Sequence, residues 1–476
     1  MSAFAAAFLA LLAGLPSSPS LELKPCRLLD FDREVRCGTY EVFENRSAGT
    51  GRKIPLRVVV IPASPASGTP VEPDPVLYFE GGPGGSAVDS GPGLTEEFAE
   101  ALRHRDLVLV DIRGTGGSDP LFCPRAEDTT TNPARARRCR EILARDHDLA
   151  QYTTDNIVAD VDEVRAALGY GKVNLLGASY GSRAALVYLR RHPEAVRTVH
   201  LHAVLPMDAR VPQSLAAHTQ TAFEKMAAAC AAEPGCRAAF PDPVGDLEAV
   251  LKRLAKPVKV TLRDDNGKKW KMRLSRDAAT RTVRYLLYRP AGARVVPLLL
   301  RRAASGDLEP LAQTAHDIAS AMLTAPAGLY LSVTCAEDVA FMDLEEATRL
   351  AKGTFMGDLR ARQQLAACAE WPAAKIPASF LEPVRSSVPV LIYAGENDPA
   401  MPIEWAERVA ATLPESRVLV VPGGAHVFYG LPGVECLDRV YSDFLTHGSS
   451  GKATGGLDIE SCRKSIKPLP FATSFE

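Results

Sequence analysis

The chain has 476 residues, of which 46% are hydrophobic, and carries a formal net charge of −2 at pH 7. It is long enough to bury a large core, and its charge is too close to zero for the basic surface that nucleic acid requires. The sequence contains no metal-spaced Cys/His cluster, phosphate-binding loop or dinucleotide fingerprint, so we expect no cofactor and no bound metal.

The amino terminus has the pattern of an export signal. The apolar stretch Phe4–Leu15 precedes the polar, proline-containing segment Pro16–Ser20, which predicts a signal peptide over residues 1–20 that is too short to span a bilayer. We therefore predict a secreted or periplasmic protein with no membrane span.

The cysteine count agrees with export. The chain has ten cysteines, and an even count in an exported protein indicates disulfides. Proximity in sequence alone suggests five bridges, which are Cys26–Cys37, Cys123–Cys139, Cys230–Cys236, Cys335–Cys368 and Cys436–Cys462.

Residues 21–206 have the pattern of the first part of a catalytic core. Leu21–Pro75 contains strand-like runs such as Arg57–Ile61, which predict an amino-terminal strand pair laid against a sheet. From Val76 to about Leu205, short apolar runs alternate with helical patterns. This alternation predicts a mostly parallel sheet flanked by helices.

A turn nearly devoid of side chains follows the first buried strand of this core. The apolar run Val76–Phe79 leads into Glu80–Ser86, which is rich in glycine. Such a turn exposes backbone N–H groups, and two preorganised donors of this kind stabilise the oxyanion that forms in acyl transfer. We expect the amides of Gly82 and Tyr180 to be these donors.

The pentapeptide Gly177–Gly181 reads G-A-S-Y-G and lies between a strand-like run and an alanine-rich helical pattern. This context is typical of a nucleophile elbow, in which glycines let the backbone turn sharply and expose the serine hydroxyl. We therefore predict Ser179 as the nucleophile.

Residues 207–382 change to a mostly helical pattern with one strand-like excursion, at 258–274. An insertion of this kind after a core strand predicts a cap that roofs the active site and restricts access to small or extended substrates. Within it, the adjacent acids Glu337 and Asp338 follow a short β-rich run that contains Cys335.

The core resumes in residues 383–476, where the acid and the base are expected. The strand-like run Val388–Ala394 ends in a loop with Asp398, which we favour as the catalytic acid over Glu396. The run Val418–Val421 then leads through two glycines to His426, the predicted general base. The order serine, acid, histidine is the one required in a hydrolase that carries its nucleophile elbow on a mostly parallel sheet.

These motifs together resemble the α/β-hydrolase aminopeptidases, the proline iminopeptidase and tripeptidyl aminopeptidase family. The matching segments lie between about residues 75 and 430. The resemblance implies an α/β-hydrolase fold with a mostly parallel central sheet and a mainly helical cap inserted before the last core strands. It also implies a serine peptidase acting on peptides with a free amino terminus, with the triad Ser179, Asp398 and His426.

Two departures from the family bear on substrate preference. Proline iminopeptidases usually carry histidine where this chain has Glu80, and the family commonly shows Asp-Gly where His202 and Ala203 stand. Family members usually have an acidic or amide residue two places after the cysteine, so we expect Glu337 to bind the substrate amine, with Asp338 as the second candidate.

Other functions use similar residues. A carboxylesterase or lipase has the same triad, which does not discriminate esters from amides. An aspartate-nucleophile hydrolase is disfavoured because the elbow residue is Ser179. A catalytically inactive binding module is disfavoured because all three triad residues are present.

Overall fold

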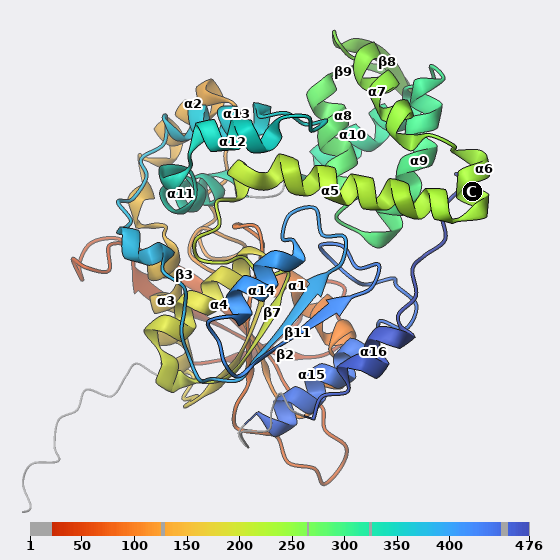
Figure 1. The fold of residues 1–476 in the computed structure, drawn as a ribbon. Coiled ribbons are helices and arrows are strands. Elements are labelled where there is room, and N and C mark those ends of the chain that lie inside the picture. Colours follow the sequence, from red (N-terminus) through yellow and green to blue (C-terminus); the bar gives the residue numbers. More distant parts are fainter. Residues whose placement is uncertain (1–20, 125–128, 264–265, 323–325, 449–455, 476) are drawn as a thin grey trace, which may run out of the picture.

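The computed structural model describes residues 21–124, 129–263, 266–322, 326–448 and 456–475. The predicted signal peptide lies outside the described residues. The chain is built around a nine-stranded sheet with the order β1-β2-β3-β5-β4-β6-β7-β10-β11 (Figure 1). The strands are β1 (Lys24–Cys26), β2 (Val35–Phe43), β3 (Lys53–Ile61), β5 (Leu107–Val110), β4 (Val76–Phe79), β6 (Val173–Ala178), β7 (Val196–His202), β10 (Val390–Gly395) and β11 (Ser416–Val421).

The sheet is parallel over most of its width. The six strands from β5 to β11 pair in parallel, whereas β1, β2, β3 and β5 pair in antiparallel fashion. The predicted mostly parallel sheet is therefore confirmed. The amino-terminal part contributes three strands rather than a strand pair, because the short β1 is held against β2 in a register that brings Cys26 near its disulfide partner Cys37.

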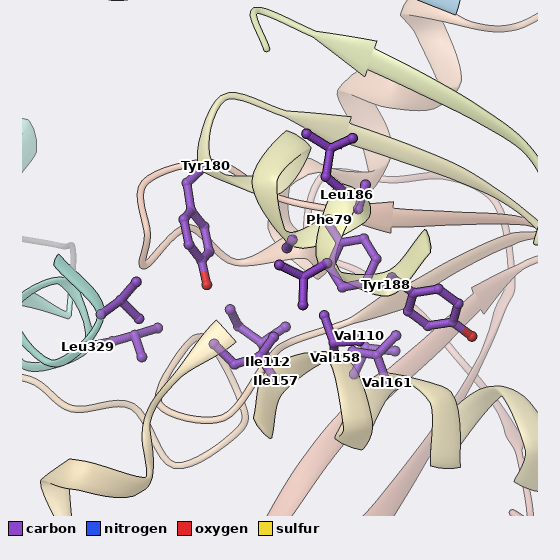
Figure 2. Packing of buried hydrophobic residues seen from close by; sticks show 14 of the residues in the cluster. Phe79, Val110, Ile112, Ile157, Val158, Val161, Tyr180, Leu186, Tyr188 and Leu329 are labelled. Carbon is purple, nitrogen blue, oxygen red and sulfur yellow. The ribbon is translucent and has the colours of Figure 1, made fainter. Parts of the chain in front are cut away.

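Helices cover both faces of this sheet because its strands are apolar on both sides. Leu77 and Phe79 of β4 belong to one hydrophobic cluster, and Val76 and Tyr78 belong to the other, as the two-residue period of a strand requires. Figure 2 shows the first cluster, where residues of α3 and α4 pack on the strands. The helices outside the cap are α1 (Ala87–Glu97), α2 (Pro133–Leu143), α3 (Thr154–Ala167), α4 (Tyr180–Arg191), α14 (Ile403–Ala410), α15 (Cys436–His447) and α16 (Ile459–Ser465).

Between β7 and β10 the chain forms a mainly helical layer, here named the cap, for which we propose residues 207–382 as bounds. In the described part of the cap, β structure is confined to the hairpin of β8 (Val258–Arg263) and β9 (Lys269–Leu274), and the long helix α5 runs along the base of the cap in Figure 1. Its helices are α5 (Val211–Ala232), α6 (Pro234–Ala239), α7 (Pro243–Arg253), α8 (Arg276–Leu286), α9 (Pro290–Ala304), α10 (Glu309–Met322), α11 (Ala327–Glu337), α12 (Leu344–Ala351) and α13 (Leu359–Cys368).

The cap has two differently packed parts. Helices α5 to α10 and the hairpin share a hydrophobic core of their own, which also receives Phe471 from the carboxyl-terminal segment. In contrast, Leu329 of α11 and Ala367 of α13 belong to the main core. The prediction of a β-rich run at 333–335 is wrong, since these residues lie inside the buried helix α11. Two β-branched residues give only a weak strand preference, and packing on all sides overrides it.

All ten cysteines form disulfides. The bridges are Cys26–Cys37, Cys123–Cys139, Cys230–Cys236, Cys335–Cys368 and Cys436–Cys462. Each bridge joins two cysteines that follow one another in the order of cysteines along the chain, and Cys335–Cys368 links α11 to α13. Of the helices in the described ranges, none has the length and apolarity needed to cross a membrane.

Candidate active site

Ser179 lies at a sharp turn between β6 and α4. Its φ of 54° and ψ of −122° are a backbone conformation that side-chain-bearing residues rarely adopt, and such strain is typical of functional positions. The flanking glycines are required by close approach, because a Cβ on Gly181 would lie 1.9 Å from the carbonyl oxygen of Phe79. A Cβ on Gly177 would lie 2.4 Å from the carbonyl oxygen of Gly181.

Asp398 and His426 form a hydrogen-bonded pair in the loops after β10 and β11. Nδ1 of His426 lies 2.8 Å from Oδ2 of Asp398. The other carboxylate oxygen of Asp398 accepts hydrogen bonds from the amides of Ala400 and Met401, at 2.8 and 3.0 Å. The acid is thus held in one orientation, and Nε2 of His426 is the ring nitrogen left to exchange a proton. The competing acid, Glu396, instead accepts from the amide of Gly423.

Ser179 and His426 line one cavity of about 1550 Å³ between the sheet and the cap. Among the described residues, no hydrogen bond joins the Ser179 hydroxyl to the imidazole. Hydrogen bonds between catalytic groups are often long in unliganded enzymes and tighten when substrate binds.

The His426 loop is held from two sides. From the core, His202 places Nε2 3.2 Å from the carbonyl oxygen of His426 and stacks on Phe428, with ring centroids 4.1 Å apart. Burial, followed by the proximity of His426, lowers the pKa of His202 to about 4, so this ring is neutral at physiological pH. From the cap, the ring of Tyr288 lies 4.8 Å from that of His426, and its carbonyl oxygen accepts from the amide of Val427.

Ala203 stands at one of the two departures from the family pattern. Ala203 has a φ of 50°, in the region that favours glycine, and the family commonly has glycine at this position. Ala203 therefore adopts a backbone conformation that is strained for a residue with a side chain.

The glycine-rich loop passes beside the nucleophile. A Cβ on Gly81 would lie 3.1 Å from that of Ser179. The amide of Gly81 donates to the carboxylate of Glu80 at 2.5 Å, and the other oxygen of this carboxylate accepts from the Ser90 hydroxyl. Within the described part of the chain, the amides of Gly82 and Tyr180 donate to no protein acceptor. Both residues line the cavity, and their amides are therefore available to an oxyanion.

A buried acid supports this loop from behind. Asp111, fully buried, accepts from the Ser86 hydroxyl at 2.7 Å and from the amides of Val88 and Gly117. It thereby joins the glycine-rich loop to the turn after β5. The sequence pattern gave Glu80 no structural role, because its contact with Ser90 depends on how α1 begins.

The structure contradicts the assignment of Glu337 as the amine-binding residue. Its carboxylate is fully buried, does not line the cavity, and accepts from the amide and hydroxyl of Thr154 at 2.7 and 2.6 Å. That hydroxyl lies 2.8 Å from the hydroxyl of Tyr180, whose ring extends from the start of α4 toward Ile157 and Leu329 in Figure 2. Burial raises the pKa of Glu337 to about 7.

The neighbouring acid, Asp338, does line the cavity. Adjacent residues at the end of a helix point about 100° apart, which separates the two carboxylates. Oδ1 of Asp338 lies 2.9 Å from Nη1 of Arg183, a fully buried arginine that also donates to two carbonyl oxygens. Over the described ranges, no group of three or more histidine, cysteine or acidic residues is placed to hold a metal ion.

A serine on a strained strand-to-helix turn, an acid after one parallel strand and a histidine after the next form the arrangement that is typical of serine hydrolases. Residues 74–431 match the family model described as alpha/beta hydrolase fold. The chain belongs to this family, and the predicted α/β-hydrolase fold is confirmed.

The relatives carry the names of peptidases. The chain is 26% identical over 424 residues to "Serine protease Hip1" of Mycobacterium tuberculosis, covering 78% of each chain. It is 32% identical over 196 residues to "Tripeptidyl aminopeptidase" of Streptomyces lividans, covering 36% of each. Among solved structures, it is similar to the proline iminopeptidase of Mycobacterium smegmatis, with 17% identity and a TM-score of 0.43 over 86% of this chain and 98% of that one.

Proposed function

We propose that the protein is an exported serine aminopeptidase that releases amino-terminal residues or short peptides through an acyl-enzyme on Ser179. The observation that carries the proposal is the pairing of His426 with a fixed Asp398 at the cavity that Ser179 lines. The names of the relatives, a serine protease and a tripeptidyl aminopeptidase, favour peptides over simple esters as substrates.

In the proposed mechanism, Nε2 of His426 takes the proton of the Ser179 hydroxyl as its oxygen attacks the scissile carbonyl. Asp398 stabilises the imidazolium that forms. The oxyanion accepts hydrogen bonds from the amides of Gly82 and Tyr180. His426 then returns the proton to the leaving amine, and water repeats the sequence to release the acyl group.

Asp338 is the carboxylate that we propose as the receptor of the substrate amine. Its Oδ1 is fixed by Arg183, while in the described structure Oδ2 accepts no hydrogen bond, so it is available to an ammonium group. Charge-assisted hydrogen bonds of this kind are roughly twice as strong as neutral ones. Export is supported by the five disulfides, which persist in oxidising compartments.

The test compares kcat/KM on a peptide amide with a free amino terminus, the same peptide with a blocked amino terminus, and a simple ester. We expect the wild type to prefer the free peptide. Asp338→Asn should weaken transition-state binding of the free peptide by about 2 kcal/mol or more, which lowers kcat/KM by roughly thirtyfold or more, and should reduce the preference over the blocked peptide. Asp307→Asn, which changes a carboxylate that is paired with Arg302 outside the cavity lining, serves as the matched control.

Two outcomes would overturn the proposal. A wild-type preference for blocked peptides would indicate an endopeptidase, and a preference for the ester would indicate the carboxylesterase or lipase alternative. Thermal unfolding of Asp338→Asn shows whether the loss of the partner of Arg183 has disturbed the fold, and Asp338→Glu, which keeps the charge, should retain part of the preference.

A further inference from the structure

Arginine and tyrosine side chains form one wall of the active-site cavity on the cap side. Arg281, Arg284 and Tyr285 of α8, with Tyr288 just beyond its end, recur at intervals of three, four and seven residues and so share one face of the helix. All four line the cavity, as does Arg360 of α13. We name Arg281, Arg284 and Arg360 the arginine face.

Arg284 is a buried cation for which the described residues provide no anionic partner. Only 8% of the surface of Arg284 is exposed to solvent. Its Nη1 donates to the Tyr288 hydroxyl at 2.8 Å, and its guanidinium lies 4.1 Å from the centroid of the Tyr285 ring. No carboxylate among the described residues lies within 4.0 Å of it. Burying an arginine carries a desolvation penalty that a bound anion offsets.

Arg360 repeats this arrangement on another cap helix, α13. It is half-buried, donates from Nη2 to the Tyr330 hydroxyl at 3.0 Å, and likewise has no carboxylate within salt-bridge distance in the described structure. Burial would raise the pKa of Tyr285, but Arg284, Arg360 and Arg281 together lower it below its usual value. The three cations therefore act on a single phenol and converge on one part of the cavity.

Another arginine of the same region, by contrast, has a carboxylate partner. Arg183 is fully buried but has the carboxylate of Asp338 and two backbone carbonyl oxygens. Arg281 also has an acidic neighbour, because Oδ2 of Asp277 lies 4.0 Å from its Nη1. Arg284 and Arg360 have phenol partners only among the interactions described, and phenols leave the guanidinium charge unneutralised.

The arginine face is close to the reacting groups. The hydroxyl of Tyr288 accepts from Arg284, and the ring of Tyr288 lies 4.8 Å from that of His426. A single side chain thus separates Arg284 from the general base. An anion held here would lie within a few residues of the scissile bond.

We propose that the arginine face binds a carboxylate of the peptide substrate. Guanidinium groups match carboxylates with parallel, bidentate hydrogen bonds, which makes them specific for this group. The carboxylate is either the carboxyl terminus of a short peptide or an acidic side chain near the scissile bond. The inference rests on the proposed peptidase function and names its substrate class, which is anionic peptides.

The test uses two matched substrate pairs, each with a free amino terminus. The first pair is one short peptide as its carboxyl-terminal acid and as its amide; the second is a longer peptide amide with aspartate or asparagine at successive positions. We expect the wild type to prefer the charged member of at least one pair by roughly tenfold or more in kcat/KM. The first pair reports a terminal carboxylate, and the second reports a side chain.

Variants then assign this preference to the arginine face. Arg360→Gln should reduce the charged-to-neutral ratio toward one, mainly through KM, and Arg284→Gln should do so more strongly. Arg302→Gln, which changes an arginine of α9 paired with Asp307 outside the cavity lining, should leave the ratio unchanged. Because Arg284 is buried, thermal unfolding is measured for each variant, and the half-buried Arg360 carries the test if Arg284→Gln does not fold.

The inference is overturned if the wild type treats charged and neutral peptides equally, or if Arg360→Gln lowers kcat/KM on both members of a pair by the same factor. Repeating the pairs with blocked amino termini separates this result from a failure of the proposed function. A charged-to-neutral preference that persists on blocked peptides and depends on Arg360 supports the carboxylate site even where aminopeptidase specificity is refuted.

Discussion

Replacing Glu337 with glutamine tests how the structure uses a fully buried acid. The carboxylate accepts from the amide and the hydroxyl of Thr154, and burial raises its pKa from 4.5 to about 7. In the unfolded chain the group titrates near its ordinary value. Between these two pKa values the folded protein therefore binds more protons than the unfolded chain, so the contribution of Glu337 to stability falls as pH rises through this window.

The magnitude follows from the shift. A change from 4.5 to about 7 corresponds to about 3 kcal/mol of stability present below the lower pKa and lost above the upper one. Glutamine imitates the protonated acid, because its oxygen can accept from the Thr154 amide while its nitrogen donates to the hydroxyl. The variant should match the wild type near about pH 4.5 and be more stable by about 3 kcal/mol near about pH 8.

Urea unfolding of both proteins at several pH values measures this difference directly, and subtracting one curve from the other removes the titration of all other groups. A difference in unfolding free energy that stays constant over this range would refute the reasoning. Kinetics supply a second check: because Glu337 does not line the cavity, Glu337→Gln should change kcat/KM by the same factor on free and blocked peptides. A loss confined to peptides with a free amino terminus would restore Glu337 as the amine receptor.

Three further substitutions test the supports of the site. Gly181→Ala places a methyl group 1.9 Å from the carbonyl oxygen of Phe79. The variant should be destabilised by about 1 to 3 kcal/mol in thermal unfolding, and a serine-reactive phosphonate should no longer label Ser179. An active, stable variant would contradict the geometry of the turn at Ser179. Glu80→Gln weakens the anchor of the glycine-rich loop and should lower kcat by roughly tenfold or more with little change in KM, whereas a change in KM alone would indicate a substrate contact. Replacing Cys335 and Cys368 by serine opens a bridge that spans 33 residues and should lower stability by about 3 kcal/mol in urea unfolding; unchanged stability would argue against the bridge.

The sequence predicts the parts of this site that depend on local signals. Ser179, Asp398 and His426 each follow an apolar run and a turn, so strand and loop patterns alone are enough to select them. Their mutual placement then follows from the fold, since the carboxyl ends of parallel strands lie at one edge of a sheet.

The parts that sequence reasoning missed depend on tertiary packing. Glu337 and Asp338 are adjacent in sequence, and only the helical conformation of α11 and its burial on all sides decide that Asp338 lines the cavity and Glu337 does not. The role of Glu80 depends on Ser90, ten residues away on α1. For Arg284 the sequence does contain a signal, because its spacing from Tyr285 and Tyr288 places the three residues on one helix face. The sequence does not show that this face lines a cavity, because the cavity is a property of the fold.

The central claim is that Ser179 is the nucleophile and His426 its base. It is tested most directly by treating the protein with a serine-reactive phosphonate and mapping the adduct by mass spectrometry. We predict a single adduct on Ser179, no labelling of Ser179→Ala, and much slower labelling of His426→Ala. Equal labelling of the wild type and Ser179→Ala, or an adduct on another serine, would contradict the claim.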